Sequence, residues 1–164
     1  MWKRFSLLLG AVVAIASCTS LAVRSETSPS VLIRMYQWSN AAMLQPADYA
    51  EQDYARFYTS DAVLIVDGVE IVRGLPAFVQ HFNRIKASGA RVQTGMPFEM
   101  ETRSGNIIYT YHVIRSVRNG EAGCMLAAGH AELRGDKIAV LSLVRTRVDP
   151  ANPVFADRCR WEER

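Results

Sequence analysis

The sequence lacks the motifs that mark several common classes of enzyme. Its three histidines have no close ligand spacing, and its three cysteines include no CxxC pair. It contains no serine nucleophile elbow and no glycine-rich phosphate loop. Only 6 prolines and 21% charged residues occur among 164, which is typical of one globular domain plus a short extra segment. We therefore expect no metal and no cofactor.

Long hydrophobic runs are also missing, apart from a short one at the N-terminus. It extends from Leu7 to Ser17, directly after Lys3 and Arg4, and is too short to span a bilayer comfortably. It ends in the sequence IASC at residues 15–18, which resembles the lipobox of bacterial lipoproteins. The resemblance implies that residues 1–17 are a signal peptide and that Cys18 is lipidated. The alternatives are an ordinary signal peptide or an uncleaved anchor.

The lipoprotein resemblance has consequences for location and partners. Because Thr19 rather than Asp follows Cys18, it implies anchoring to the outer membrane, with the domain facing the periplasm. Loss of Lys3 and Arg4 lowers the formal charge from +3 to +1, so no argument for nucleic-acid binding remains. Disulfides persist outside the cytoplasm. Cys124 and Cys159 are thus expected to form a bridge, with two buried free thiols as the alternative.

The mature chain divides into a tether, a domain and a tail. Residues 18–30 are rich in Ser and Thr and predict a flexible tether, residues 31–148 the domain, and residues 149–164 a C-terminal tail. Apolar spacing predicts helices over residues 31–43 and 75–87. A further helix is expected in PADYAEQDYARFY, with Asp48 as its cap.

Turn signals predict how the strands pair. Asp67-Gly68 lies inside a Val- and Ile-rich stretch and predicts a hairpin. Asn119-Gly120 sets Tyr109 opposite His130. Gly135-Asp136 sets His130 opposite Leu141, which places Ser142 on the other face. Both faces are largely apolar, so we expect one to be covered by the helices and the other by a second copy of the chain, with His130 in that homodimer contact.

Two segments resemble a known superfamily. FYTSDAVLIVDGVEIVRGLPAFVQHF and GHAELRGDKIAVLSLV are similar to SnoaL-like and ketosteroid isomerase-like proteins of the nuclear transport factor 2-like superfamily. The resemblance covers about residues 31–148. It implies an α+β fold in which a cone-shaped, curved antiparallel sheet wraps on about three N-terminal helices. These motifs belong to the scaffold and do not identify a chemistry.

The catalytic residues of the isomerases have poor counterparts in this sequence. Their catalytic Asp would correspond to Asp67, which is displaced by one residue and has the turn-forming Asp-Gly context as its simpler explanation. Their buried acid would fall near Gly129, which has no side chain. Tyr36 is the candidate for their tyrosine, with a core role as the alternative. Steroid isomerisation by the family mechanism is therefore not expected.

The resemblance also implies that the Gly129 face lines the cone. Candidate ligand-binding residues are then Tyr36, Thr110, His112 and Ser142. His112 is also a candidate general base, although a hydrogen-bonded core histidine is the commoner case. Arg145 and Arg147 are expected at an exposed sheet end, and would favour an acidic ligand if they faced a pocket mouth.

Three functions fit this sequence. We favour an envelope lipoprotein that binds a small apolar ligand or an envelope partner without catalysis. The alternative is an isomerase, dehydratase or cyclase that acts by proton transfer, with Asp67 or His112 as base. A purely structural envelope protein would have its cone filled by side chains.

Overall fold

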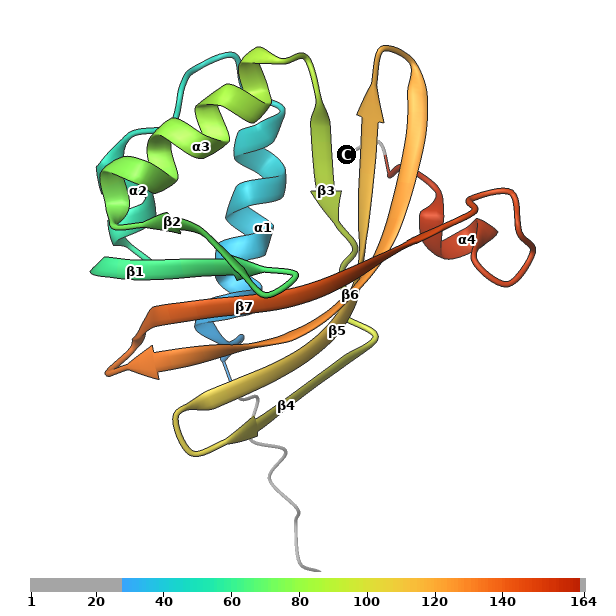
Figure 1. Ribbon diagram of the computed structural model, residues 1–164. Helices are drawn as coiled ribbons and strands as arrows, with labels where there is room; N and C mark the ends of the chain where they lie inside the picture. The colour runs from blue at the N-terminus through green and yellow to red at the C-terminus, as the bar shows by residue number, and fades with distance from the viewer. Residues whose placement is uncertain (1–27, 163–164) are drawn as a thin grey trace, which may run out of the picture.

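The computed structural model describes residues 28–162, which form four helices and seven strands (Figure 1). Residues 1–27, and with them the predicted signal peptide, Cys18 and most of the tether, lie outside the described residues. In chain order the elements are α1 (Val31–Met43), α2 (Glu51–Ala55), β1 (Tyr58–Val66), β2 (Val69–Arg73), α3 (Leu75–Ala87), β3 (Arg91–Thr94), β4 (Met100–Ser104), β5 (Ile107–Arg118), β6 (Glu121–Arg134), β7 (Lys137–Val148) and α4 (Ala156–Cys159). Within residues 28–162 no helix is long and apolar enough to cross a membrane.

The helices begin at recognisable caps. The Ser30 hydroxyl accepts a hydrogen bond from the Ile33 amide at 3.1 Å and starts α1. The predicted cap of α2, Asp48, is wrong: the N-cap is Ala50, whose amide donates to the Asp53 carboxylate at 2.9 Å. A carboxylate within the first turn thus replaces the expected side chain before it.

The sheet is strongly curved and nearly all antiparallel. Its strand order is β2-β1-β7-β6-β5-β3. The remaining strand, β4, pairs with β5, as β3 does. One pair, β1 with β7, is parallel, which corrects the expectation of a fully antiparallel sheet. These two strands are far apart in sequence and need no hairpin between them. Figure 1 shows the long strands β5, β6 and β7 curving around α1 and α3, so the predicted α+β cone is confirmed.

The register between the long strands was predicted correctly on one side only. β5 and β6 pair as the Asn119-Gly120 turn predicts, with Tyr109 opposite His130. The β6–β7 prediction is wrong by one residue, because β7 has an extra residue, Ala139, in a β-bulge opposite Glu132 and Leu133, and His130 faces Ser142. A shift of one residue exchanges the two faces of a strand. Leu141 and Leu143 therefore join the inner face, and Ser142 the outer face.

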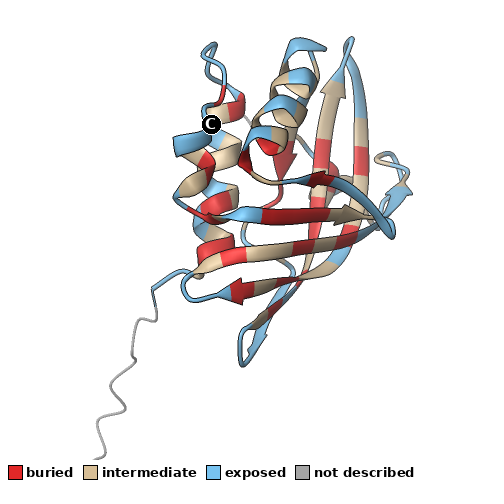
Figure 2. Ribbon diagram, turned by 60° about the vertical axis from the view of Figure 1, so that its left-hand side comes forward, coloured by how far each residue is buried: buried red, intermediate tan, exposed pale blue. Residues whose placement is uncertain are grey.

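The core lies between the inner face of the sheet and the helices. Leu32 and Met35 of α1 and Phe78 of α3 are buried there, together with Ile108 and Ile138 from the strands. In Figure 2 the buried residues lie along the middle of the strands and on the helices, whereas the loops are exposed. Because the helices pack on the inner face, they do not cover the outer face of the sheet.

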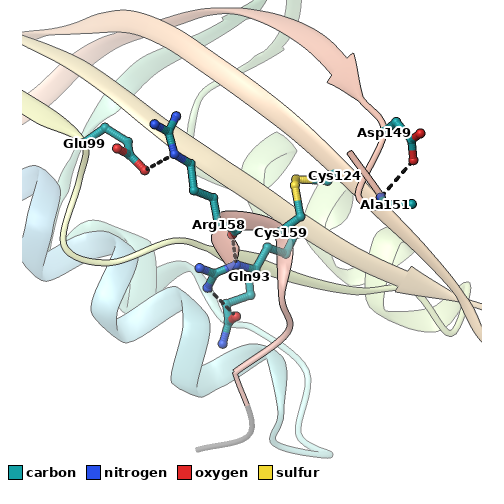
Figure 3. Close-up of a disulfide and its surroundings, with 8 residues drawn as sticks. Gln93, Glu99, Cys124, Asp149, Ala151, Arg158 and Cys159 are labelled. Carbon is teal, nitrogen blue, oxygen red and sulfur yellow. Dashed lines mark hydrogen bonds and ion pairs between the residues drawn. A yellow bond between two sulfur atoms is a disulfide. The ribbon is translucent and has the colours of Figure 1, made fainter. Parts of the chain in front are cut away.

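The C-terminal tail covers part of the outer face. The sulfurs of Cys124 in β6 and Cys159 in α4 are bonded at 1.99 Å, and Val113, Leu126 and Phe155 pack around them (Figure 3). A buried arginine, Arg115, adds polar contacts: its Nε donates to the Arg158 carbonyl at 2.7 Å, and its Nη1 donates to Gln93 Oε1 and lies 3.1 Å from Glu162 Oε1. The disulfide and the contacts of Arg115 thus hold the tail on the sheet.

Candidate ligand cavity

A cavity of about 200 Å³ lies inside the cone, between the inner face of the sheet and the side chains of α1 and α3. Its wall is mainly apolar and aromatic. The lining residues are Met35, Tyr36, Ser39, Asn40, Met43, Tyr54, Tyr58, Leu64, Val66, His81, Phe82, Ile85, Val92, Thr94, Ile114, Met125, Leu141, Leu143 and Arg145. Such a volume is below the roughly 300–1,000 Å³ of pockets for drug-sized molecules. The space therefore suits a small apolar molecule.

Four polar lining residues are partly or fully exposed, and we call them the mouth of the cavity: Ser39, Asn40, His81 and Arg145. Asn40 is fully engaged: its side-chain amide donates to the Thr94 carbonyl at 2.7 Å, and its oxygen accepts from the Thr94 amide at 2.8 Å. This pair of bonds ties α1 to β3 beside the cavity. Burial and the nearby Arg84 lower the pKa of His81 below its usual value.

Arg145 brings the permanent charge to the mouth. Its Nε and Nη2 donate to Asp67 Oδ2 at 3.3 and 2.8 Å, and its backbone amide donates to Asp67 Oδ1 at 2.8 Å. Asp67 sits in the β1–β2 turn with a positive φ of 54° and does not line the cavity. Arg145 hydrogen bonds hold the pKa of the Asp67 carboxyl below its usual range. A carboxylate so stabilised in its charged form is a poor general base.

His112 lies in the closed end of the cone, which we define as Tyr36, Phe98, Thr110 and His112. The imidazole is fully buried, stacked on Phe98 at a centroid distance of 5.1 Å and tilted against Tyr36 at 5.3 Å. Tyr36 also lines the cavity, whereas His112 does not. Tyr36 thus connects the two parts of the interior.

Three buried polar atoms of the closed end have no hydrogen-bond partner among the residues that the structure describes. This holds for both ring nitrogens of His112 and for the hydroxyl of Thr110. Burial lowers the pKa of His112 to about 4, so the ring is neutral at pH 7. In a neutral imidazole one ring nitrogen donates a hydrogen bond and the other accepts one, so each nitrogen of His112 could bind a polar group.

Two expected features of the inner face are corrected. Ser142 lies on the outer face, because the bulge after Glu132 shifts β7 by one residue. Gly129 does not leave room for a ligand: a Cβ there would lie 2.0 Å from the Ser142 carbonyl oxygen and 2.8 Å from Leu143 Cδ2. The glycine accommodates the close approach of β7, and Leu143 fills the space that small residues were expected to leave open.

Several cavity residues were missed at the sequence level. Sequence reasoning named Tyr36 but not His81, Phe82 and Ile85 of α3, which form one wall. Helical spacing places Phe82 and Ile85 on one apolar side of α3, which indicates an inward face but not that a cavity lies against it. Arg145 could be assigned to the mouth only after the bulge was known. Within residues 28–162 no group of three His, Cys, Asp or Glu side chains is arranged to hold a metal ion.

Comparison with known proteins identifies the architecture. The sequence matches no protein-family model and no curated protein. Solved structures of nuclear transport factor 2-like (NTF2-like) proteins do match, among them one of unknown function from Exiguobacterium, with a TM-score of 0.55 and 15% identity over 73% of this chain and 99% of that one. The chain has the NTF2-like fold.

Two further structural neighbours carry named activities. An epoxide hydrolase from M. tuberculosis aligns with a TM-score of 0.54 and 14% identity, over 71% of this chain and 83% of that one. A protein assigned as a SnoaL-like polyketide cyclase from Jannaschia aligns with a TM-score of 0.54 and 11% identity, over 79% of this chain and 88% of that one. The NTF2-like fold thus hosts several chemistries, and identities this low transfer none of them.

Proposed function

We propose that this protein is a lipid-anchored envelope protein whose cone binds a small apolar molecule without transforming it. The observation that carries the proposal is the cavity of about 200 Å³ with its apolar and aromatic wall. Burial of apolar surface contributes about 25 cal/mol per Å², so even a small ligand gains useful affinity there. The two candidate bases support a non-catalytic role: Asp67 is paired with Arg145 outside the cavity, and His112 lies behind its wall.

The binding proposal is tested by native mass spectrometry of the full chain purified from membranes. We expect a bound small molecule on the wild type that is lost in Ile114→Phe, because a larger side chain in the wall fills the cavity. Val69→Phe, at a 60% exposed position on β2, is the matched control and should keep the ligand. A wild-type protein that carries no small molecule and takes none up would contradict the proposal.

The membrane anchor is a separate part of the proposal and rests on the sequence of residues 15–18. We expect the full chain to enter the detergent-rich phase in a phase-separation experiment, with the mass of a diacylglyceryl group on Cys18. In Cys18→Ala that added mass should disappear. A wild-type chain without lipid on Cys18 would reject the lipoprotein assignment and leave the cavity proposal untouched.

A second copy of the chain is the proposed partner of the uncovered outer face. Met100, Tyr111, Ala128 and Val144 lie directly opposite one another on β4, β5, β6 and β7, and we call them the outer-face row. Met100 is 51% and Val144 61% exposed. An apolar row across the middle of a sheet can be buried by the same row of a second copy in a two-fold dimer.

One observation favours an enzymatic alternative, in which the cone is a proton-transfer site for an isomerisation, dehydration or cyclisation. Both nitrogens of the neutral His112 ring are without partners, and Tyr36 joins this ring to the cavity. The ligands recovered from wild type and from His112→Leu distinguish the two functions. Identical compounds support binding alone, whereas a substrate that accumulates only in the variant supports catalysis.

A further inference from the structure

We propose that the cavity selects small amphipathic anions, and that Arg145 Nη1 binds the ligand's carboxylate at the mouth. This inference rests on the proposed binding function and specifies its ligand class. The deep wall would hold a short hydrocarbon chain, and the acid group would remain at the partly exposed rim. The argument has three parts: the charges of the lining, the orientation of Arg145, and the separation of Arg145 from a neighbouring arginine.

The charged side chains that line the cavity are all of one sign. The 19 lining residues include one arginine and no aspartate or glutamate. Burial and the nearby Arg84 lower the pKa of His81, which favours its neutral form. The nearby carboxylate, Asp67, approaches Arg145 from the β1–β2 turn and is not part of the lining. The charge of Arg145 is balanced by Asp67 behind it, but the group that faces the cavity lining is the guanidinium and not the carboxylate, which favours a negative head group over a positive one.

The orientation of Arg145 is fixed by its neighbours. Asp67 accepts from Nε, Nη2 and the backbone amide of Arg145, so one edge of the guanidinium is held in place. The structure gives Nη1 no partner among the described residues. The Arg145 side chain is 36% exposed, so a ligand group can reach it from the solvent. A prepositioned donor loses little conformational entropy when it binds a carboxylate.

Arg147 is a natural comparison, since it lies two residues further along β7 and on the same face. It lines a different hollow near the tip of the β5–β6 hairpin and takes no part in the cavity. Loss of Arg147 removes the same formal charge from the same strand. Arg147→Gln therefore controls for the loss of a positive charge from β7. Because Arg145→Gln also leaves Asp67 unpaired, it is compared with Arg145→Gln combined with Asp67→Asn: a specific contact would be lost in both Arg145 variants and retained in Arg147→Gln.

The test is isothermal titration of the full chain in lipid nanodiscs with hexanoate, 1-hexanol and hexylamine, corrected with empty nanodiscs. We expect hexanoate to bind about five- to tenfold more tightly than 1-hexanol, the gain of one charge-assisted hydrogen bond at a partly exposed site. Hexylamine should bind most weakly. Arg145→Gln should remove the preference for the acid, and Arg147→Gln should retain it.

Each contrary result has a distinct meaning. If 1-hexanol binds as tightly as hexanoate, or if hexylamine binds best, the anion proposal is overturned and the apolar cavity stands. If the acid is preferred but Arg145→Gln keeps that preference, the assignment to Arg145 is overturned. If none of the three compounds binds, the proposed binding function fails together with this inference.

Discussion

The two faces of the central strands are buried by different means. On the inner face, α1 and α3 cover β5, β6 and β7 with aliphatic and aromatic side chains and leave a cavity of about 200 Å³. On the outer face, a short tail is held by one disulfide and by the buried Arg115, and the outer-face row stays bare. The inner face thus depends on packing, whereas the outer face depends on a covalent bond and on charge. The two faces should therefore respond differently to substitution.

Removing the disulfide should have the largest effect on stability. The Cys124–Cys159 bridge closes a loop with a sequence separation of 35, for which chain entropy gives about 3 to 4 kcal/mol. We expect Cys124→Ser with Cys159→Ser to lower the free energy of unfolding by that amount in urea titrations. Hexanoate affinity should be unchanged, since neither cysteine lines the cavity. An equal stability of wild type and double variant would show that Arg115 and packing alone hold the tail.

Acidification should affect the inner face through His112. Its pKa is lowered to about 4 in the folded protein and is about 6.5 in the unfolded chain, so the folded state binds fewer protons between these values. The contribution of the neutral His112 ring to the free energy of unfolding is therefore complete above about pH 6.5, and it is lost as the pH falls toward 4.

The expected loss is about 3 kcal/mol, and unfolding titrations between pH 7 and pH 4 measure it. His112→Leu should reduce the pH dependence by this amount. His130→Leu, on the outer face, is the control and should leave the loss in place. A wild type and His112→Leu with parallel pH profiles would contradict a neutral buried His112.

A larger side chain at Gly129 should lower the free energy of unfolding by somewhat less than protonation of His112 does. A methyl group there would meet the backbone oxygen of Ser142, which cannot move without breaking the β6–β7 pairing. We expect Gly129→Ala to lower the free energy of unfolding by about 2 to 3 kcal/mol, within the range for overpacked cores. Gly123→Ala on the same strand meets only the rotatable Ser116 hydroxyl and should cost far less. Equal costs at both glycines would argue against the close approach of β7.

The outer-face row should affect association and not stability. Val144→Asp places a charge at a 61% exposed position, so its free energy of unfolding should change by less than about 0.5 kcal/mol. Sedimentation velocity should show a dimer for wild type and a monomer for Val144→Asp. Val69→Asp, at a similarly exposed position on β2, should remain dimeric. A wild type that is monomeric at all concentrations would reject the second-copy proposal.

The sequence predicted local structure well because local signals were strong. The Asn119-Gly120 turn fixed the β5–β6 register, and helical periodicity gave α1 and α3 at their observed bounds. The bulge after Glu132 has no comparable signal, since it depends on how β6 and β7 curve over the helices. That single extra residue moved Ser142 out of the interior and Leu143 into it. The site was therefore predicted less well than the fold, and Arg145 was assigned to the mouth only by the structure.

The direction of α1 sets which side of the molecule a ligand approaches. The chain enters this helix at Ser30, and the cavity is lined by its later residues, from Met35 to Met43. The attachment point of the tether and the mouth therefore lie toward opposite ends of the helix, which rises about 20 Å over its 13 residues. An attachment at the start of α1 would therefore leave the residues of α1 that line the cavity away from the attachment point. A partner or surface that holds the chain by its N-terminal segment could then leave the route to Arg145 open.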